Sequence, residues 1–259
     1  GMGMVMDPYH KERPNLREMF ARWLENDPAA QARLHGAHLT GRIVGWPLNT
    51  YSPTTQRHGD RIMLIGDAAN LVDPLNGEGI HIALESGQIA ARVAHEALRA
   101  DDLSDSFLAR YDQRWQAAFG LDLNIANLYV TLGTNRSLTG TWLSLLRLVG
   151  STANRDKPYA GVITGVLAGV VPTRKSLTVG FVLKTLLHRP STYASLLGAP
   201  TQDSRELLPW GRASLKNAAG LLTEIAKEPG PTWEWAKDVI DSGLSVLAGL
   251  VRSHIHARK

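Results

Sequence analysis

Cysteine is absent from all 259 residues of the sequence. Its absence excludes structural disulfides, thiolate zinc sites, iron–sulfur clusters and a cysteine nucleophile. No hydrophobic run reaches the roughly 18 residues that a membrane-spanning helix needs, and the first residues lack the basic and long apolar regions of a signal peptide. Charged residues make up 20% of the chain, the net charge is +4, and the basic residues form no block. We therefore expect no nucleic-acid partner, and an anionic membrane surface is the better candidate.

The hydrophobic pattern separates a mixed α/β part from an almost wholly helical part, with a boundary near residue 135. Apolar residues at helical spacing predict an amphipathic helix from Leu16 to Leu24. Residues 38–48 contain alternating and β-branched residues interrupted by glycine, which predicts strands of an antiparallel sheet. Glycine recurs every fourth residue within 159–171, a segment that reads as a buried or interfacial helix. Further helices are predicted at residues 104–132, 142–148, 158–171, 177–188, 204–226 and 232–253.

Residues 61–65 form a short continuous apolar run, which is typical of a strand buried on both faces. Gly66-Asp67 closes the run, a loop rich in glycine, proline and asparagine follows, and a long helix is predicted from about Gly79. The inner face of this helix is expected to carry mostly small residues that let it lie close to a sheet: Ile80, Ala83, Leu84, Gly87, Ala90, Ala91 and Ala94. A strand, a glycine-bearing loop and a helix in this order form half of a nucleotide-binding unit.

The loop between this strand and this helix holds the residue types of a ligand site. Gly66 lets the backbone approach a ligand, and Asp67 presents a carboxylate that can accept hydrogen bonds from sugar-type hydroxyls. The turn at residues 77–79 leaves the amides of Gly79 and Ile80 free at the positive end of a long helix. An electron-rich atom, such as the pyrimidine edge of a flavin, would be stabilised there. Gly-Asp alone is ordinary turn chemistry, but the combined pattern is far more restrictive.

The same pattern resembles a known family. Residues 66–80 read G-D-A-A-x4-P-x2-G-E-G-I and continue with Ala83, Ser86-Gly87 and Ala90-Ala91. This is similar to the second flavin-binding motif of geranylgeranyl reductase-like FAD-dependent oxidoreductases, within the p-hydroxybenzoate hydroxylase-like superfamily. The resemblance covers about residues 41–95. It implies the following FAD contacts: Asp67 with the ribitol, Gly66 and Ala68 near the ribitol and pyrophosphate, and Pro74 with the backbone of Gly77, Glu78, Gly79 and Ile80 against the isoalloxazine.

The resemblance also implies a fold class and a division into domains. The fold class is α/β, as the remnant of a Rossmann-like FAD-binding domain and a substrate-domain sheet, followed by an α-helical C-terminal region. Residues 1–60 are then the remainder of the substrate-binding sheet domain, 61–135 the C-terminal part of the FAD-binding domain, and 136–259 the helical region. The family's first fingerprint, GxGxxG, grips the ADP half of FAD and is absent here, because Gly1-Met2-Gly3 does not supply it. We therefore expect the C-terminal portion of a longer enzyme.

Several other residues each allow two interpretations. Trp46, Pro47 and Tyr51 could line a lipid-substrate cavity that faces the flavin, or they could pack in the core. The tryptophans of the helical region, together with its lysines and arginines, could contact a membrane surface or pack on the rest of the protein. No catalytic acid or base can be assigned, and no metal site is expected, because His254 and His256 do not share a helix face. Ser86 lacks the context of a nucleophile elbow.

The activity that the resemblance implies is reduction of carbon–carbon double bonds in a polyprenyl, geranylgeranyl-type lipid by FAD. NAD(P)H or another reductant would be the electron donor, and a lipid or another hydrophobic small molecule the substrate. The expected location is the cytoplasm, and the alternative is a cytoplasmic protein that associates peripherally with a membrane. The same Gly-Asp motif serves flavin monooxygenases, which is the alternative activity. A hypothesis of another class is a noncatalytic membrane-binding or interaction module with a vestigial flavin fold.

Overall fold

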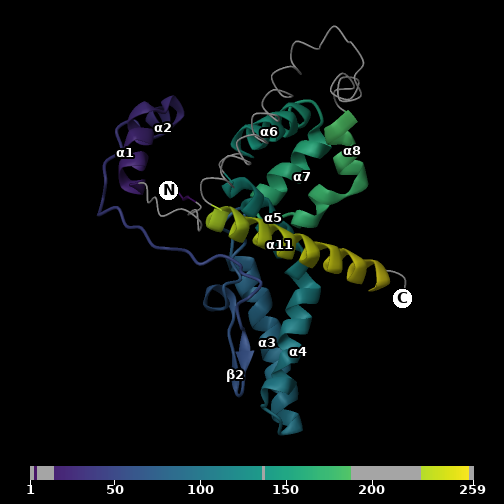
Figure 1. Cartoon of the computed structure of the whole chain (residues 1–259). Coiled ribbons are helices and arrows are strands. Elements are labelled where there is room, and N and C mark those ends of the chain that lie inside the picture. The colour runs from purple at the N-terminus through teal and green to yellow at the C-terminus, as the bar shows by residue number, and fades with distance from the viewer. Residues whose placement is uncertain (1–2, 5–14, 136–137, 188–228, 257–259) are drawn as a thin grey trace. The chain divides into compact units, whose positions relative to one another are not determined.

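The computed structural model describes residues 3–4, 15–135, 138–187 and 229–256 (Figure 1). The chain divides into two units, residues 1–48 and 49–259, and each is treated by itself. Helices dominate the described residues, and the sheet among them has two strands. The helical character of the C-terminal region is therefore confirmed for its described part, whereas the α/β part contains less sheet than the sequence predicts. None of the described helices is long and apolar enough to cross a membrane.

The first unit contains α1 (Leu16–Asn26) and α2 (Pro28–Arg33). The side chain of Asn15 caps α1 by accepting from the amide of Glu18 at 3.3 Å. The predicted helix from residue 16 is thus confirmed. The strands predicted over residues 38–48 are wrong, because this segment has no regular structure and its side chains are exposed. A strand needs a neighbour to pair its backbone groups, and the described residues of this unit supply none.

The second unit begins with a short β-hairpin that leads into the Gly-Asp turn. β1 (His58–Gly59) pairs antiparallel with β2 (Ile62–Met63), with His58 opposite Met63. The predicted strand at residues 61–65 is therefore shorter than expected. Its burial on both faces is also wrong, because the side chains of Ile62 and Ile65 are 54% and 44% exposed. The hairpin lies against α4 (Asp105–Trp115).

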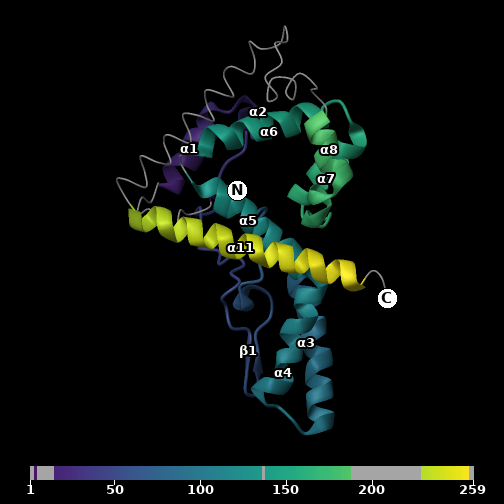
Figure 2. The same ribbon diagram turned by 45° about the vertical axis from the view of Figure 1, so that its right-hand side comes forward.

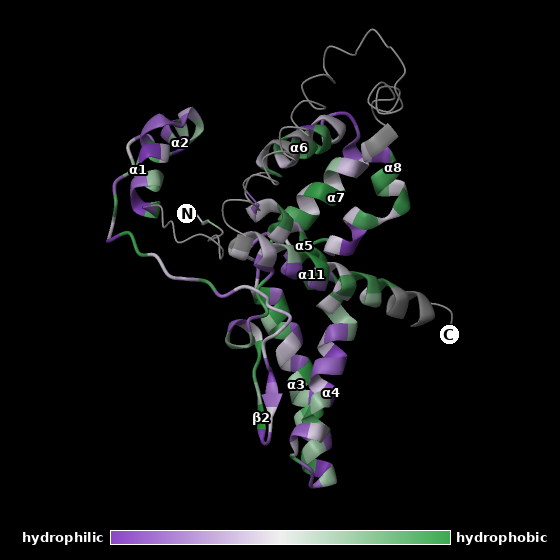
Figure 3. Cartoon of the chain, in the orientation of Figure 1, coloured by the Kyte–Doolittle hydropathy of each residue, from purple (hydrophilic) through white to green (hydrophobic). Residues whose placement is uncertain are grey.

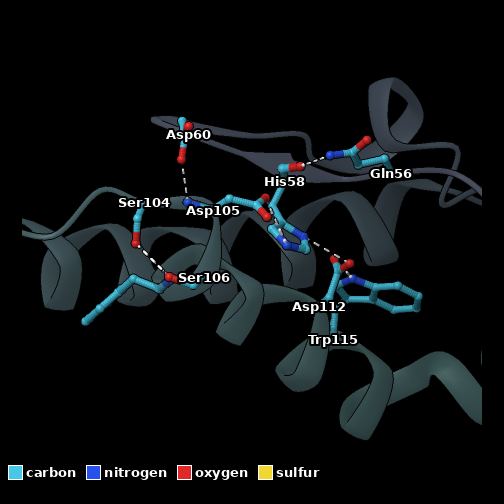
Figure 4. Close-up of polar contacts among 9 residues, drawn as sticks. Gln56, His58, Asp60, Ser104, Asp105, Ser106, Asp112 and Trp115 are labelled. Carbon is cyan, nitrogen blue, oxygen red and sulfur yellow. Dashed lines mark hydrogen bonds and ion pairs between the residues drawn. The ribbon is translucent and has the colours of Figure 1, made fainter.

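Polar contacts hold the hairpin on α4 (Figure 4). The imidazole of His58 lies between two carboxylates of α4, with Nδ1 3.1 Å from Asp112 and Nε2 3.4 Å from Asp105. Asp60, in the hairpin turn, accepts from the backbone amide of Asp105 at 2.7 Å. The indole of Trp115 donates to the other oxygen of Asp112 at 2.7 Å. The hairpin is therefore fixed at both ends of its short ladder.

The long helix predicted from about residue 79 is confirmed as α3 (Ile80–Ala100), but its predicted inner face is only partly correct. Ile80, Leu84 and Ala91 are exposed, whereas Ala90 is buried and the small residues Ala83 and Gly87 lie beside Gly66 and Ile65. The core face carries three β-branched side chains besides serine and alanine, and it packs towards α4: Ile82, Ser86, Ile89, Ala90, Val93 and Ala97. Burying β-branched residues against a helix removes more apolar area from water than burying alanine does, so this face forms the core.

The core of this unit lies between α3, α4 and the hairpin. Ser104 caps α4, and a π-helical turn (η2, Gln116–Gly120) joins α4 to α5 (Leu121–Thr134). The helix predicted over residues 104–132 is thus confirmed, with one irregular turn. Trp115 and Phe119 stack at 5.7 Å between ring centroids. The buried apolar side chains around them make up one cluster: Tyr51, Ala69, Leu71, Ile82, Ile89, Ala90, Val93, Ala97, Leu108, Tyr111, Trp115, Phe119 and Leu123.

The described C-terminal region comprises α6 (Thr139–Ala153), α7 (Lys157–Leu167), the 3-10 turn η4 (Thr173–Leu177), α8 (Val179–Leu187) and α11 (Pro229–His256). α11 lies across α5 in both views (Figures 1 and 2), and Trp235 donates to the carbonyl of Thr131 at 2.7 Å. α7 and α8 are joined by stacked Tyr159 and Phe181 rings. Figure 3 shows that α6, α7 and α8 are more apolar than α1 and α4. The helix predicted over residues 204–226 lies outside the described residues.

Candidate cofactor site

The Gly-Asp turn is held against α3. Gly66 has φ +52° and opens a 3-10 turn (η1, Gly66–Ala69). A Cβ on Gly66 would lie 2.8 Å from the Cβ of Ala83, so only glycine allows this approach. The amide of Gly66 donates to the hydroxyl of Ser86 at 3.1 Å, and that hydroxyl donates to the carbonyl of Ala83 at 3.0 Å. Ser86 is therefore a structural link between the turn and the helix.

Asp67 lies beside the start of α3. A Cβ on Gly79 would lie 3.2 Å from Oδ1 of Asp67 and 3.1 Å from the side chain of Val72. The side chains of Asp67 and Ala68 are exposed, and no hydrogen bond or ion pair within the described residues holds the Asp67 carboxylate. The carboxylate is thus available to accept from a ligand hydroxyl at this position.

The loop from residue 70 to residue 79 is fixed by hydrogen bonds within itself. Asp73 accepts from the amide of Leu75 at 2.8 Å, and Asn76 accepts from the amide of Glu78 at 2.8 Å. The amide of Asp73 donates to the carbonyl of Glu78 at 2.8 Å, which closes the loop around Pro74 and Gly77. Pro74 is buried, and Gly77 has φ +74°. Burial raises the pKa of the Asp73 carboxyl, and the nearby charge of Asp122 adds to that effect.

The N-terminus of α3 carries no side-chain cap and no acidic residue in its first turn. Gly79 directly precedes the helix, and the side chain of Ile80, its first residue, is exposed. An uncapped start of a 21-residue helix presents free amides and a partial positive charge, which favours an anionic or electron-rich ligand atom. Gly66, Asp67, Gly79 and Ile80 are thus brought together around one exposed carboxylate and one open helix end.

The three predicted substrate residues lie in different places. Trp46 and Pro47 belong to the first unit, and both side chains are exposed, Trp46 at 92%. Tyr51 lies in the core of the second unit, where its hydroxyl donates to Asn124 at 2.9 Å and its ring meets Trp115 edge to face. Burial raises the pKa of the Tyr51 hydroxyl to about 12. The backbone amide of Tyr51 donates to the carbonyl of Val72, so Tyr51 contacts the loop at that residue.

The chain is similar to curated proteins from archaea and from a eukaryote. It is 52% identical over 68 residues to digeranylgeranylglycerophospholipid reductase 2 of Methanopyrus kandleri, covering 26% of this chain and 17% of that protein. It is 36% identical over 120 residues to digeranylgeranylglycerophospholipid reductase of Methanococcus aeolicus, covering 46% and 29%. Over the matched segments, the chain is similar to these digeranylgeranylglycerophospholipid reductases. The chain is also 30% identical over 112 residues to conditioned medium factor receptor 1 of Dictyostelium discoideum, covering 43% of this chain and 22% of that protein.

The matches span less than a third of the length of these three proteins. No family model and no solved structure matches the chain.

Sequence reasoning missed the buried residue Arg57, which supports the candidate site. The Arg57 side chain is 2% exposed and donates to the carbonyls of Ala69 at 2.8 Å and Ser52 at 2.7 Å. Its guanidinium also lies 4.8 Å from the ring centre of Trp115. Burial lowers the pKa of Arg57. An arginine in a polar loop carries no local signal of such a role, because its partners are backbone carbonyls and rings from other segments.

Proposed function

We propose that this chain carries the flavin-contacting part of an FAD-dependent oxidoreductase that reduces carbon–carbon double bonds of a polyprenyl lipid. The observation that carries the proposal is the position of the free Asp67 carboxylate beside Gly79, at the uncapped start of α3. The printed names of the archaeal relatives, which are reductases of a digeranylgeranyl lipid, support the substrate class.

The residues present fit the flavin half of FAD. Asp67 would accept from ribitol hydroxyls, with Gly66 and Ala68 beside it. The backbone from Gly77 to Ile80 would lie against the isoalloxazine, and the free amides of α3 would stabilise negative charge on its pyrimidine edge. Pro74 is buried, so it would support this loop from within. When bound, the reduced flavin would supply the hydride for one new C–H bond, a proton from solvent would complete the other, and NAD(P)H or another reductant would restore the reduced flavin. The chain's own part is to bind and orient the flavin, and no residue of it is assigned a proton transfer.

An exposed apolar surface supports the idea that the flavin site is completed by a further sheet. Ile62, Ile65, Ile80 and Leu84 are all at least 44% exposed, and they lie on the hairpin and on the outward side of α3. A Cβ on Gly87 would lie 3.7 Å from Ile65, so the two elements share this surface. A unit with a GxGxxG turn, which binds the ADP half of FAD, would bury these side chains by packing on this surface.

Flavin absorbance tests the proposal. We would purify the protein from its complete reading frame and this 259-residue chain, add FAD, and compare Asp67→Ala with Glu85→Ala. Glu85 is the matched control because its carboxylate is also exposed near the start of α3. We expect flavin bands that Asp67→Ala abolishes and Glu85→Ala retains. Flavin occupancy unchanged by Asp67→Ala, or no bands in either protein, would overturn the proposal. Gain of hydrogen in the lipid product, rather than oxygen, distinguishes a reductase from a monooxygenase.

We also propose peripheral contact of α11 with a lipid surface. Trp233, Ile240, Leu244 and Leu247 recur at helical spacing on α11, and each side chain is exposed. Cosedimentation with vesicles that contain anionic phospholipid tests the contact, with Leu244→Glu compared against Leu98→Glu, an exposed leucine near the C-terminal end of α3. Binding that is weakened by the first change alone supports the proposal, and equal binding of both variants and the unchanged protein contradicts it.

A further inference from the structure

The C-terminal turn of α7 touches the loop of the candidate cofactor site. The side chain of Asn76 donates from Nδ2 to the carbonyl of Val166 at 3.0 Å, while its Oδ1 accepts from the amide of Glu78 at 2.8 Å. One carboxamide therefore bridges the end of α7 and the segment that leads into Gly79. The helical region thus borders the site directly.

Two glycines make this contact possible. Gly169 has φ +68°, and a Cβ there would lie 2.8 Å from Cγ of Glu78. A Cβ on Gly165 would collide with the side chain of Val171. The amides of Val170 and Val171 both donate to the carbonyl of Gly165, at 2.9 and 3.0 Å, which closes the turn. Gly165 therefore allows the turn to close, and Gly169 allows the turn to lie close to Glu78 of the loop.

The turn presents exposed apolar side chains next to that loop. Val166 is buried, but Leu167 and Val170 are 57% and 77% exposed. Val170 directly follows Gly169, where a Cβ would collide with the side chain of Glu78, and Leu167 directly follows Val166, whose carbonyl accepts from Asn76. Both apolar side chains therefore belong to residues adjacent to the points where α7 meets the loop.

We infer that Leu167 and Val170 contact the polyprenyl chain of the lipid substrate; this inference rests on the proposed function. A double bond that receives hydride must lie within about 3.5 Å of the donating atom, and the proposed flavin lies against residues 77–80. The rest of the polyprenyl chain is apolar, so its binding is most favourable where it lies against apolar protein surface beyond the flavin. The end of α7 is such a surface, and it adjoins the loop.

Cysteine footprinting tests the inference, because these 259 residues contain no cysteine and an introduced thiol is the only one in the chain. We would compare Val170→Cys and Leu167→Cys with Val179→Cys. Val179 lies at the start of α8 and is 75% exposed, which matches Val170. Each variant is treated with a maleimide in detergent micelles, with digeranylgeranylglycerophospholipid, with a saturated diacyl phospholipid of the same headgroup, or with neither.

We expect the polyprenyl lipid to slow labelling at positions 167 and 170 at least fivefold and to leave position 179 unchanged. Equal protection at all three positions, equal protection by the saturated lipid, or no protection would each overturn the inference. Flavin occupancy and lipid reduction are measured on the same preparations. Reduction of the lipid without protection at 170 would overturn this inference alone. Absence of both flavin and lipid reduction would overturn the proposed function, and the labelling pattern would still decide whether the turn binds the lipid.

Discussion

Asn76 and Val166 are joined by a hydrogen bond of 3.0 Å although 90 positions separate them in the sequence. The bond connects the loop of the candidate cofactor site to the end of α7, in a region whose sequence matches no motif. The same Asn76 side chain also accepts from the amide of Glu78. A shift of α7 would therefore displace the segment that leads into α3. Part of the helical region therefore supports the conformation of the loop.

Replacement of Gly169 tests this coupling. Gly169→Ala places a Cβ 2.8 Å from Cγ of Glu78 on a backbone with φ +68°, so we expect a loss of about 1–3 kcal/mol in the free energy of unfolding and weaker flavin binding. Gly180→Ala is the control, because a Cβ there meets nothing within 4 Å and alanine favours the helix. Thermal unfolding and FAD titration measure both effects. Equal behaviour of the two variants would contradict the coupling.

The helices were predictable from the sequence because their signals are local. Asn15, Ser104 and Asp156 each sit before a helix and accept from its first turn, and apolar residues recur at helical spacing behind them. The face of α3 was not predictable in the same way. Ile80 and Leu84 lie on one side of α3 and Ile82 and Ile89 on the other, so periodicity allows two inner faces. The choice depends on α4, whose packing on α3 is a tertiary contact.

The candidate site also has parts that could be predicted from local signals and parts that could not. The Gly-Asp turn, the loop and the helix start could be predicted, because glycines and one carboxylate within residues 66–80 carry the pattern. The residues that support this site could not be predicted. Ser86 and Arg57 bind backbone groups of other segments, and the sequence gives no local signal of such hydrogen bonds. The strand at residues 61–65 was over-predicted for a related reason: an apolar run predicts a buried strand only where a neighbouring strand is present.

Arg57 is expected to stabilise the Gly-Asp turn through its hydrogen bond to the carbonyl of Ala69. In Arg57→Lys the ammonium cannot reach the carbonyls of Ser52, Thr55 and Ala69 together, so buried acceptors lose their donors. We expect a loss of about 2–4 kcal/mol in the free energy of unfolding, measured by urea titration. Arg110→Lys is the control, because Arg110 is exposed and lies over the ring of Phe107. Similar losses in both variants would contradict this role.

The buried carboxyl of Asp73 makes stability depend on pH. Burial raises its pKa in the folded state, so the folded state holds this proton more tightly than the unfolded chain does. The associated stability is complete below the ordinary aspartate pKa and is lost as pH rises through the raised value. Asp73→Asn keeps an acceptor for the amide of Leu75 without the charge. We therefore expect the variant to be more stable than the unchanged protein at neutral pH and less dependent on pH.

Urea unfolding at a series of pH values from about 4 to 8 tests this expectation. Three neighbouring groups must be considered, since Asp122 raises the pKa of Asp73 while His81 and the amides of the loop lower it. Glu85→Gln, at an exposed position on α3, controls for removal of a negative charge as such. If Asp73→Asn followed the same pH curve as Glu85→Gln, burial of Asp73 would not be the cause of the pH dependence.

Ser86 is expected to be required for the geometry of the flavin-contacting turn. Ser86→Ala removes the acceptor of the Gly66 amide, which is buried, and an unpaired buried amide costs about 1–3 kcal/mol. The turn can recover that bond only by moving away from α3, which would carry Asp67 away from Gly79. We therefore expect flavin affinity to fall at temperatures where the variant is still folded. Ser106→Ala, at an exposed serine of α4, is the control, and circular dichroism with FAD titration compares the two. Loss of stability without loss of flavin affinity would limit Ser86 to a structural role.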